Sequence, residues 1–528
     1  MLPDYRTTFD SVPRPSEKVL LTVAVFLAGL CSIIYELVIS TTSSYFLGDS
    51  VKQFSLTIGT YMFAMGIGSF LTKYVEGKEL EAFVRTEIAL GLIGGASVPL
   101  LYWLFQFQTN GQYQWTMLGL VFTIGMLTGV EIPLLARVMK TYYPLKDNLA
   151  NVLGYDYIGA LGATLLFPFL LLPFVGLYSS SLIFGAVNLL LGLAVTLFFK
   201  DQLSPGRRNR IYAWTIGGLI LFSILLWRAE PFLEAWEARA YPHRVIYKEQ
   251  SPYQKIVLTQ NDDDLRLYLN RVIQFSSRDE YRYHEALALV PSAYGDGVRN
   301  ALVLGGGEGL LARELLKLPE LQRVTIVDLD QRIFDLAGRH GGLADLNDGA
   351  LADPRTQIRA EDAAVFLRND TSFYDLIIAD LPDPSSESVA RLYSTWFFKM
   401  AKARLAENGV FATQATSPYH TRDTYWCVYE TLKASGYGTV RPYHVNVPSF
   451  GEWGFVMAFD QPSPENDQLA YREDVDTKFL DPQLVSTFSY FPKDIRNPGN
   501  IRPNRLDKPV LLDYFLEEWS SWQREKTM

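Results

Sequence analysis

The first 230 residues contain apolar runs that are long enough to cross a lipid bilayer as helices. Crossing the hydrocarbon core takes about 20 apolar residues. Seven runs have roughly this length, at residues 19–40, 53–72, 86–107, 115–136, 150–175, 178–199 and 211–228. The first run is too long for a cleaved signal peptide and lacks a small-residue cleavage site. We therefore expect residues 1–230 to form a polytopic α-helical membrane domain of about seven spans, with the lipid bilayer as a partner.

Lysine and arginine residues are concentrated in alternate loops between these runs. They occur before the first run, and in every second loop after it: Arg6, Arg14, Lys18, Lys73, Lys78, Arg85, Arg137, Lys140, Lys146, Lys200, Arg207, Arg208 and Arg210. The intervening loops offer only Lys52. By the positive-inside rule this distribution predicts a cytoplasmic N-terminus. Seven crossings would then put the second half of the chain outside.

Four acidic residues lie within the apolar runs or at their ends, namely Glu36, Glu87, Glu131 and Asp156. A charge at membrane depth is costly, so such residues usually face a bundle interior or a water-filled cavity. One interpretation is a pathway or pocket for a cation. The other, of equal weight, is polar cross-linking between helices or, for Glu87, a position among lipid headgroups.

The chain after residue 230 has the composition of a soluble, charged protein. The net charge of −9 falls largely in this part, which argues against nucleic acid as a partner and is compatible with small cationic molecules. The two cysteines, Cys31 and Cys427, lie in different halves of the chain. The sequence therefore offers neither a disulfide framework nor a metal-ligand cluster, and no bound metal is expected.

Strand-like and helix-like segments alternate between residues 298 and 460. A small β-hairpin unit with a helix at 278–291 is predicted before them, over 241–292. Residues 461–528 are predicted to be a C-terminal extension. Strands are predicted at 301–304, 324–329, 356–361, 374–379, 409–415, 439–447 and 453–459, and helices at 308–318, 331–340, 362–369, 388–405 and 421–436. This alternation predicts an α/β Rossmann-like domain of the S-adenosylmethionine methyltransferase type, with an antiparallel pair formed by its last two strands.

Glycines and acids follow the ends of successive predicted strands. Ligands of open α/β sheets bind at the carboxyl ends of the strands. Glycines in such a loop let the backbone approach a ligand closely, and an acid after the next strand accepts hydrogen bonds from ribose hydroxyls. The residues in order are Gly305, Gly307, Gly309, Asp328, Asp362, Asp380 and Asp383. Each feature alone is weak, since turns use glycine freely and Asp362 has the position of a helix N-cap. Together they predict a nucleoside site, and Glu308 inside the loop indicates a positive group on the ligand.

The stretch "YDLIIADLPDP" at 374–384 carries two of these acids, Asp380 and Asp383, on a turn stiffened by Pro382 and Pro384. Adjacent carboxylates without a cation raise one another's pKa, and a bound amine relieves that repulsion. The less favoured interpretation of these two acids is a purely structural turn in which one of them caps a helix.

Five segments between residues 240 and 460 resemble the spermidine synthase family of polyamine aminopropyltransferases, and specifically its membrane-attached multi-span branch. The segments are "SPYQKIVL" (251–258), "SRDEYRYHEALALVP" (277–291), "VLGGGEG" (303–309), "VDLD" (327–330) and "DLIIADLPDP" (375–384). The resemblance implies transfer of an aminopropyl group from decarboxylated S-adenosylmethionine, a cosubstrate, to an amine such as putrescine, with no prosthetic group. A homodimer is a further expectation.

The resemblance also implies roles for single residues. Asp380 would deprotonate the attacking amine and Asp383 would hold it. Asp328 would bind the ribose, Asp362 the adenine amino group, and Glu308 the aminopropyl ammonium. The remaining substrate contacts implied are Gln254, Tyr283, His284 and Phe450, the last standing where the family often has a tyrosine. Leu310 and Ala363 replace glycines that are common in the family, and the acceptor pocket departs most from its pattern.

Two other functions are compatible with the sequence. A membrane-anchored methyltransferase using intact S-adenosylmethionine would share the fold and the nucleoside site, although Glu308 would then lie near the methionine carboxylate. A degenerate synthase domain that senses or transports polyamines is the second, and the presence of both Asp380 and Asp383 argues against degeneracy. Because donor nucleosides are cytoplasmic, we expect the second half to be cytoplasmic, against the loop charges counted with seven spans.

Overall fold

The computed structural model describes residues 15–47, 50–140, 142, 145–238, 241–462 and 468–526. The chain divides into two compact units, residues 1–236 and 237–528.

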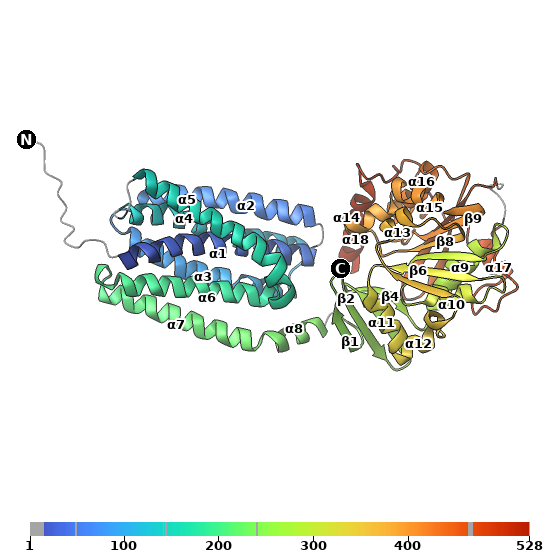
Figure 1. Ribbon diagram of the computed structural model, residues 1–528, viewed down its shortest axis with the longest axis horizontal. Coiled ribbons are helices and arrows are strands. Elements are labelled where there is room, and N and C mark those ends of the chain that lie inside the picture. Colours follow the sequence, from blue (N-terminus) through green and yellow to red (C-terminus); the bar gives the residue numbers. More distant parts are fainter. Residues whose placement is uncertain are drawn as a thin grey trace, which may run out of the picture. The chain divides into compact units, whose positions relative to one another are not determined.

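The first unit consists of long helices that lie side by side (Figure 1). They are α1 (Pro15–Leu47), α2 (Ser50–Leu71), α3 (Glu79–Leu104), α4 (Asn110–Met139), α5 (Leu145–Leu166) with its π-helical continuation η2 (Phe167–Val175), α6 (Leu177–Phe198), α7 (Pro205–Trp227) and the short α8 (Ala229–Ala238). Among the described residues, seven helices are long and apolar enough to cross a membrane. The seven predicted apolar helices are thereby confirmed as helices; short 3-10 turns η1 (Thr72–Tyr74) and η3 (Lys200–Gln202) follow α2 and α6.

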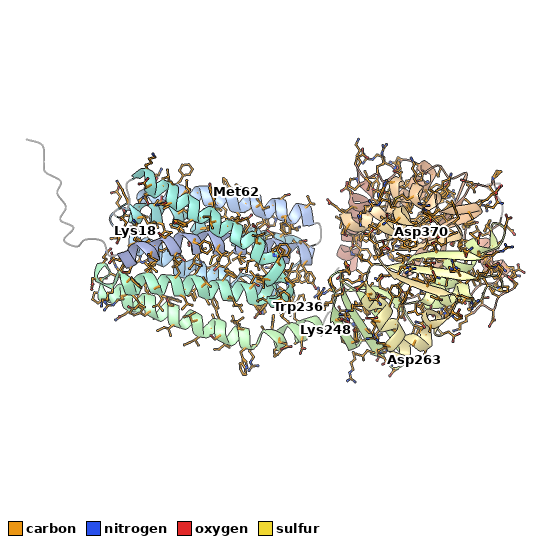
Figure 2. The ribbon with its side chains drawn as sticks, in the orientation of Figure 1. Lys18, Met62, Trp236, Lys248, Asp263 and Asp370 are labelled. Atoms are coloured by element: carbon orange, nitrogen blue, oxygen red, sulfur yellow. The ribbon has the colours of Figure 1, made fainter. Side chains whose placement is uncertain are left out.

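Glycines allow the helices of this unit to pack closely. A Cβ atom on Gly68 of α2 would lie 2.0 Å from the backbone oxygen of Met126, and one on Gly129 of α4 would lie 2.1 Å from that of Met65. Small residues at such crossings are typical of helices that pack in lipid. The outer surface is apolar, as Met62 illustrates: its side chain is 66% exposed and lies on the outside of the unit (Figure 2).

The second unit begins with a four-stranded antiparallel sheet, as predicted. Its strands pair in the order of the chain: β1 (Arg244–Gln250), β2 (Lys255–Asn261), β3 (Asp264–Leu269) and β4 (Val272–Ser276). Leu258 and Leu267 pair across it, and both lie in a small apolar core shared with helix α11 (Gln331–Arg339). Helix α9 (Glu280–Leu289) and the turn η4 (Pro291–Ala293) lead into the larger sheet.

The larger sheet has seven strands in the order β10-β11-β9-β8-β5-β6-β7. Their bounds are β5 (Asn300–Gly305), β6 (Arg323–Asp328), β7 (Thr356–Ala360), β8 (Tyr374–Asp380), β9 (Leu405–Gln414), β10 (Thr439–Val447) and β11 (Gly451–Phe459). β5 to β9 pair in parallel, while β11 is antiparallel to both β9 and β10. The predicted strands and the predicted antiparallel pair are confirmed.

Helices cover both faces of this sheet (Figure 1). Successive residues of β5 point to opposite faces: Ala301 and Val303 lie in one apolar core, Leu302 and Leu304 in the other. This is why parallel strands are apolar runs rather than alternating ones. The remaining helices and turns are α10 (Leu310–Leu316), α12 (Gly341–Leu346), η5 (Ala350–Ala352), α13 (Ala363–Asn369), α14 (Glu387–Ala390), η6 (Arg391–Tyr393), α15 (Thr395–Lys402), α16 (Arg422–Ala434), α17 (Pro482–Thr487) and α18 (Val510–Lys526).

The single helix predicted at 388–405 is wrong. The segment forms α14, η6 and α15, and the break is at Ser394, whose backbone is extended and whose hydroxyl caps α15 by accepting the N–H of Phe397. Serine favours such a cap over a helix interior, because its oxygen satisfies a backbone donor that the helix leaves unpaired. Strand β9 also begins earlier than predicted, at Leu405.

Residues after 460 pack on the α/β core through buried polar contacts. Glu285 of α9 accepts the backbone N–H groups of Lys478, Phe479 and Leu480 at 2.7 to 3.2 Å. The carboxylate of Glu518 on α18 accepts the N–H groups of the first turn of α16, at Asp423 and Thr424. The C-terminal residues therefore stabilise helices on the sheet.

Candidate active site

The carboxyl ends of β5, β6 and β8 meet at one edge of the sheet. Gly305, at the end of β5, has a φ of 89°, and a Cβ atom there would lie 1.9 Å from the backbone oxygen of Asp380. Only glycine permits both this conformation and this approach. The glycine loop 305–309 is thereby pressed against the end of β8, where Asp380 and Asp383 follow.

Asp328 ends β6 beside the same loop. Its carboxylate accepts the backbone N–H of Gly307 at 3.2 Å and that of Asp330 at 2.9 Å. Burial raises the pKa of Asp328 to about 6, against the lowering effect of these two donors. Asp328 and the predicted loop glycine Gly307 are in contact, while Gly309, with a φ of 84°, precedes α10.

Gln254 lies at the same corner but contacts a different acid. Its amide donates to Asp330 at 3.2 Å, and Ser251 donates to the same oxygen at 2.6 Å. Asp330 in turn caps α11 by accepting the N–H of Arg332. The loop between β1 and β2 is therefore fastened to the strand end that carries Asp328.

Asp362 is a helix N-cap, as its position after β7 allowed. One carboxylate oxygen accepts the N–H groups of Ala364 and Val365 at 2.9 and 3.0 Å, and the other pairs with Arg391 of η6. Both oxygens are engaged within the chain. The contact predicted with an adenine amino group would have to share or displace Arg391.

Three titratable groups converge between the glycine loop, α9 and the end of β8. The ligand atoms of His284, Glu308 and Asp380 all lie within 4.8 Å of one another, and Nε2 of His284 is 3.9 Å from Oε1 of Glu308. The hydroxyl of Tyr283 donates to Oδ1 of Asp380 at 2.5 Å. Such a cluster has the size for one cationic group, either an ammonium or a metal ion.

Burial and neighbouring charges shift the pKa values of Glu308 and Asp380. Burial, with the nearby Asp380 carboxylate, raises the pKa of Glu308 to about 7. Burial also raises the pKa of Asp380, while His284 and Tyr283 oppose the rise. Acids of this kind gain most from a cation that arrives with a substrate, because the cation offsets the cost of a carboxylate charge in a buried site.

A second layer fixes the imidazole of His284. Its Nδ1 is 2.8 Å from Glu280, which also accepts both terminal nitrogens of Arg313 at 2.8 and 2.9 Å. Burial opposes ionisation of Glu280, but His284 and Arg313 lower its pKa to about 2. Burial likewise opposes a charge on His284, yet Glu280, Glu308 and Asp380 together raise its pKa. The ring nitrogen Nε2 is left facing Glu308.

Hydrogen bonds from Tyr393 and Gln414 support the turn that carries Asp383. The hydroxyl of Tyr393 contacts the backbone oxygens of Leu381 and Pro382 at 3.0 and 3.1 Å, and the amide of Gln414 donates to Leu381 at 2.6 Å. Burial raises the pKa of Asp383 to about 7, with Gln414 opposing the rise. The two acids of the turn are thus held in place independently of any ligand.

Comparisons with known proteins identify what this chain is similar to. Residues 280–470 match the "Spermine/spermidine synthase domain" family. "Polyamine aminopropyltransferase 1" of Ralstonia nicotianae is 41% identical over 516 residues, which are 97% of both chains. "Polyamine aminopropyltransferase" of Leptospira interrogans is 38% identical over 95% of this chain and 98% of its own. A solved spermidine synthase from Thermotoga maritima is 24% identical over 53% of this chain and 88% of its own, at a TM-score of 0.39.

The chain belongs to the spermidine synthase family of polyamine aminopropyltransferases. It is therefore a transferase, and the family uses decarboxylated S-adenosylmethionine as a cosubstrate without a prosthetic group. The relative from R. nicotianae matches along almost the whole chain, so the helical unit is shared as well as the α/β unit.

The candidate site also lies beside the β10–β11 turn. Phe450 packs edge-on against Tyr283, with ring centroids 6.1 Å apart. The backbone N–H and hydroxyl of its neighbour Ser449 donate to Asp279 at 2.6 and 2.8 Å. Asp279 precedes α9, so one residue links the turn bearing Phe450 to the helix bearing Tyr283.

Sequence reasoning did not identify the supporting residues of this site. Glu280 could have been found, because it lies four residues before His284 on α9 and such pairs share a helix face. Arg313, Tyr393 and Gln414 carry no comparable signal. They reach the site from α10, η6 and β9, and only the fold brings them there.

Proposed function

We propose that the chain is a membrane-bound aminopropyltransferase that converts putrescine to spermidine with decarboxylated S-adenosylmethionine as donor. The observation that carries the proposal is the convergence of Asp380, Glu308, Tyr283 and His284 beside the supported turn of Asp383. A donor with a sulfonium and an ammonium, next to a diamine, supplies cations for these acids.

The donor lies, in this proposal, against the glycine loop. Asp328 binds the ribose hydroxyls and Glu308 the aminopropyl ammonium. Gln254 acts near the nucleoside through the Asp330 corner, and Asp362 reaches the adenine on exchange of its Arg391 contact. Gly305, Gly307 and Gly309 allow the backbone to approach the nucleoside.

The acceptor amine lies between Asp380, Asp383 and Phe450. Its nitrogen attacks the methylene carbon next to the sulfonium sulfur, a C–N bond forms, and the C–S bond breaks with its electron pair going to sulfur. The proton lost by the amine goes to Asp380. Tyr283 and His284 hold Asp380 and Glu308 in orientation, so the enzyme acts mainly by alignment and proton acceptance.

A product assay tests this function. Purified full-length protein is incubated with decarboxylated S-adenosylmethionine and a panel of amines, and in parallel with intact S-adenosylmethionine. Methylthioadenosine and spermidine are the expected products with putrescine, in the presence or absence of EDTA. S-adenosylhomocysteine as the sole nucleoside product would indicate a methyltransferase, and loss of activity with EDTA would assign the acid cluster to a metal.

We further propose that the helical unit crosses the membrane and that the α/β unit is cytoplasmic, where the donor is made. Seven crossings with the basic loops in the cytoplasm would instead place the α/β unit outside. An even number of crossings would place it in the cytoplasm. Protease protection of the C-terminus in sealed inside-out and right-side-out vesicles separates the two topologies. The predicted homodimer is testable by light scattering of the same protein.

A further inference from the structure

The helical unit contains a pair of acids that the transferase reaction does not use. Glu87 of α3 and Glu131 of α4 are 0% and 1% exposed. Glu87 lies eight residues after the start of α3 and Glu131 eight residues before the end of α4. At 1.5 Å per residue, both are about 12 Å from the same end of the bundle. The helices α3 and α4 pack together, and the two carboxyl groups act electrostatically on each other.

This pair is short of hydrogen-bond donors. Within the described residues, both oxygens of Glu87 and Oε1 of Glu131 accept no hydrogen bond. Two further buried groups near them are also unsatisfied, the hydroxyl of Tyr35 and Oδ1 of Asn188, each on a residue 1% exposed. A buried polar atom without a partner costs free energy comparable to a lost hydrogen bond. Three of the four carboxyl oxygens of the pair therefore accept no hydrogen bond in this arrangement of the described residues.

Tyr35 and Asn188 approach the pair from two different helices, α1 and α6. The ring of Tyr35 on α1 lies 2.6 Å from where a Cβ of Gly94 would be, two turns after Glu87 on α3. Asn188 on α6 lies one turn before Gly192, whose Cβ would be 3.4 Å from that of Glu87. These contacts place unsatisfied polar groups around Glu87 on two sides.

The titratable neighbours of the pair come from three helices and add no positive charge. They are Cys31 and Tyr35 of α1, Tyr61 of α2, which bonds to Ser32 and Thr128 and on which Glu36 also acts, and Asp156 of α5. α7 presents the apolar Phe222 to α3 at Gly95. In the part of the chain that the structure describes, neither acid has a lysine, arginine or histidine acting on it.

We propose that Glu87 and Glu131 form a proton-binding site in the helical unit, with one proton shared between the two carboxyl groups at neutral pH. A proton supplies the missing donor, and it removes one of two adjacent negative charges from an apolar interior. Because almost no surface of either acid is open to water, an ammonium group or a hydrated metal ion, which are larger, does not fit. Ionisable groups at membrane depth that lack counter-charges are typical of proton sites.

Asp156 connects this site to its surroundings. It is half-buried, acts electrostatically on Glu131, and lies against Gly29 of α1, where a Cβ would be 2.6 Å from its Oδ1. In this proposal a proton leaves the Asp156 carboxyl group and joins the Glu87–Glu131 pair, so one acid is ionised as the other is neutralised. The site is separate from the transferase reaction and does not depend on its substrate.

Infrared difference spectroscopy of the full-length protein in lipid nanodiscs tests the proposal. At about pH 8 the acids of the α/β unit whose pKa is raised to about 7 are mostly ionised, so a protonated carboxyl group seen there belongs mainly to the helical unit. We expect a carboxylic acid C=O band that shifts on exchange into D₂O. E87Q and E131Q are each expected to change its frequency and the double variant to remove it, whereas E76Q, which alters an exposed acid, leaves it unchanged.

The wild-type spectrum alone decides the proposal if the variants do not fold. Absence of a protonated carboxyl band at about pH 8 would overturn it, as would a band that survives in the folded double variant. Titration with sodium chloride and with spermidine at constant pH distinguishes the other occupant. Loss of the band on addition of either cation would assign the pair to cation binding instead.

Discussion

Both units of this protein bury acids side by side, but only one unit surrounds them with donors. In the α/β unit, Asp380 accepts the Tyr283 hydroxyl and Glu308 faces the imidazole of His284. In the helical unit, Glu87 and Glu131 have no donor on three of their four oxygens within the described residues. The acids of the α/β unit suit a large cationic substrate that enters and leaves. The buried pair of the helical unit suits a proton, which occupies almost no volume.

The difference follows from how each fold brings acids together. Parallel strands end at a common edge, which is open to ligands and lined by backbone N–H groups. Helices in a bundle satisfy their backbone groups internally, so they offer an acid in the interior only side chains. Replacing acids by amides, which keep the shape and remove the charge, therefore has opposite consequences in the two units.

The largest effect is expected for Asp380→Asn. An amide cannot take the proton from the attacking amine, so kcat should fall by about 10³-fold, within the range for loss of a general base. Steady-state rates of methylthioadenosine release measure this. D345N, on the exposed face of α12, is the matched control and should retain full activity. A fall in kcat of less than tenfold would mean that Asp380 is not the base.

The next effect is expected for Asp383→Asn. Loss of one carboxylate from the amine site should raise the KM for putrescine about tenfold, equivalent to about 1.4 kcal/mol. The KM for the donor should change less than twofold, because the donor lies on the glycine-loop side. Equal losses for both substrates, together with a lowered melting temperature, would assign Asp383 to the fold.

A pH dependence of substrate binding should follow from Asp383, which faces putrescine, and from Glu308, which faces the donor ammonium, because the pKa of each is raised to about 7. Since both values lie above the usual ones, these acids are protonated below about pH 7 and bind a cation poorly there. They also lower the stability of the free protein as pH rises from the usual values through 7. Putrescine, which stays protonated throughout, should bind about tenfold more tightly at pH 8 than at pH 6.

Calorimetric Kd values at the two pH values test this dependence. D383N should remove most of the difference, because it removes the titrating acid that faces putrescine. Putrescine-induced increases in melting temperature should likewise be greater at pH 8 than at pH 6. A Kd for putrescine that is independent of pH would show that Asp383 is already ionised in the free protein at pH 6.

The sequence was sufficient to predict the features that depend on the order of strands and helices along the chain. The acids at the ends of β6 and β8 were predictable, because strand ends can be read from apolar runs and the topology of alternating strands and helices puts them at one edge. The break at Ser394 was not, since the residues around it favour a helix and one cap decides otherwise.

Contacts between distant residues were beyond the sequence. Asn504, far beyond the predicted α/β domain, donates to the backbone oxygens of Ala390 and Tyr393 and so holds the segment whose tyrosine supports the Asp383 turn. The pairing of Glu87 with Glu131 was equally hidden, because it depends on the rotation of α3 against α4. A single sequence identifies which acids are unusual but not which of them meet.

The smallest effect is expected for Glu87→Gln in the helical unit. If the pair shares a proton, a neutral amide replaces an acid that is neutral part of the time, and its NH₂ group adds donors where the site lacks them. The free energy of unfolding in mild detergent should then change by less than about 1 kcal/mol, or rise. An ionised Glu87 paired with a bound cation would instead cost about 3 kcal/mol on substitution, because the partner charge would be left buried and unpaired. Denaturant unfolding of E87Q beside E76Q therefore distinguishes the two states of the pair. A loss near 3 kcal/mol in the free energy of unfolding would show that the helical unit, like the α/β unit, holds ionised acids for a cation.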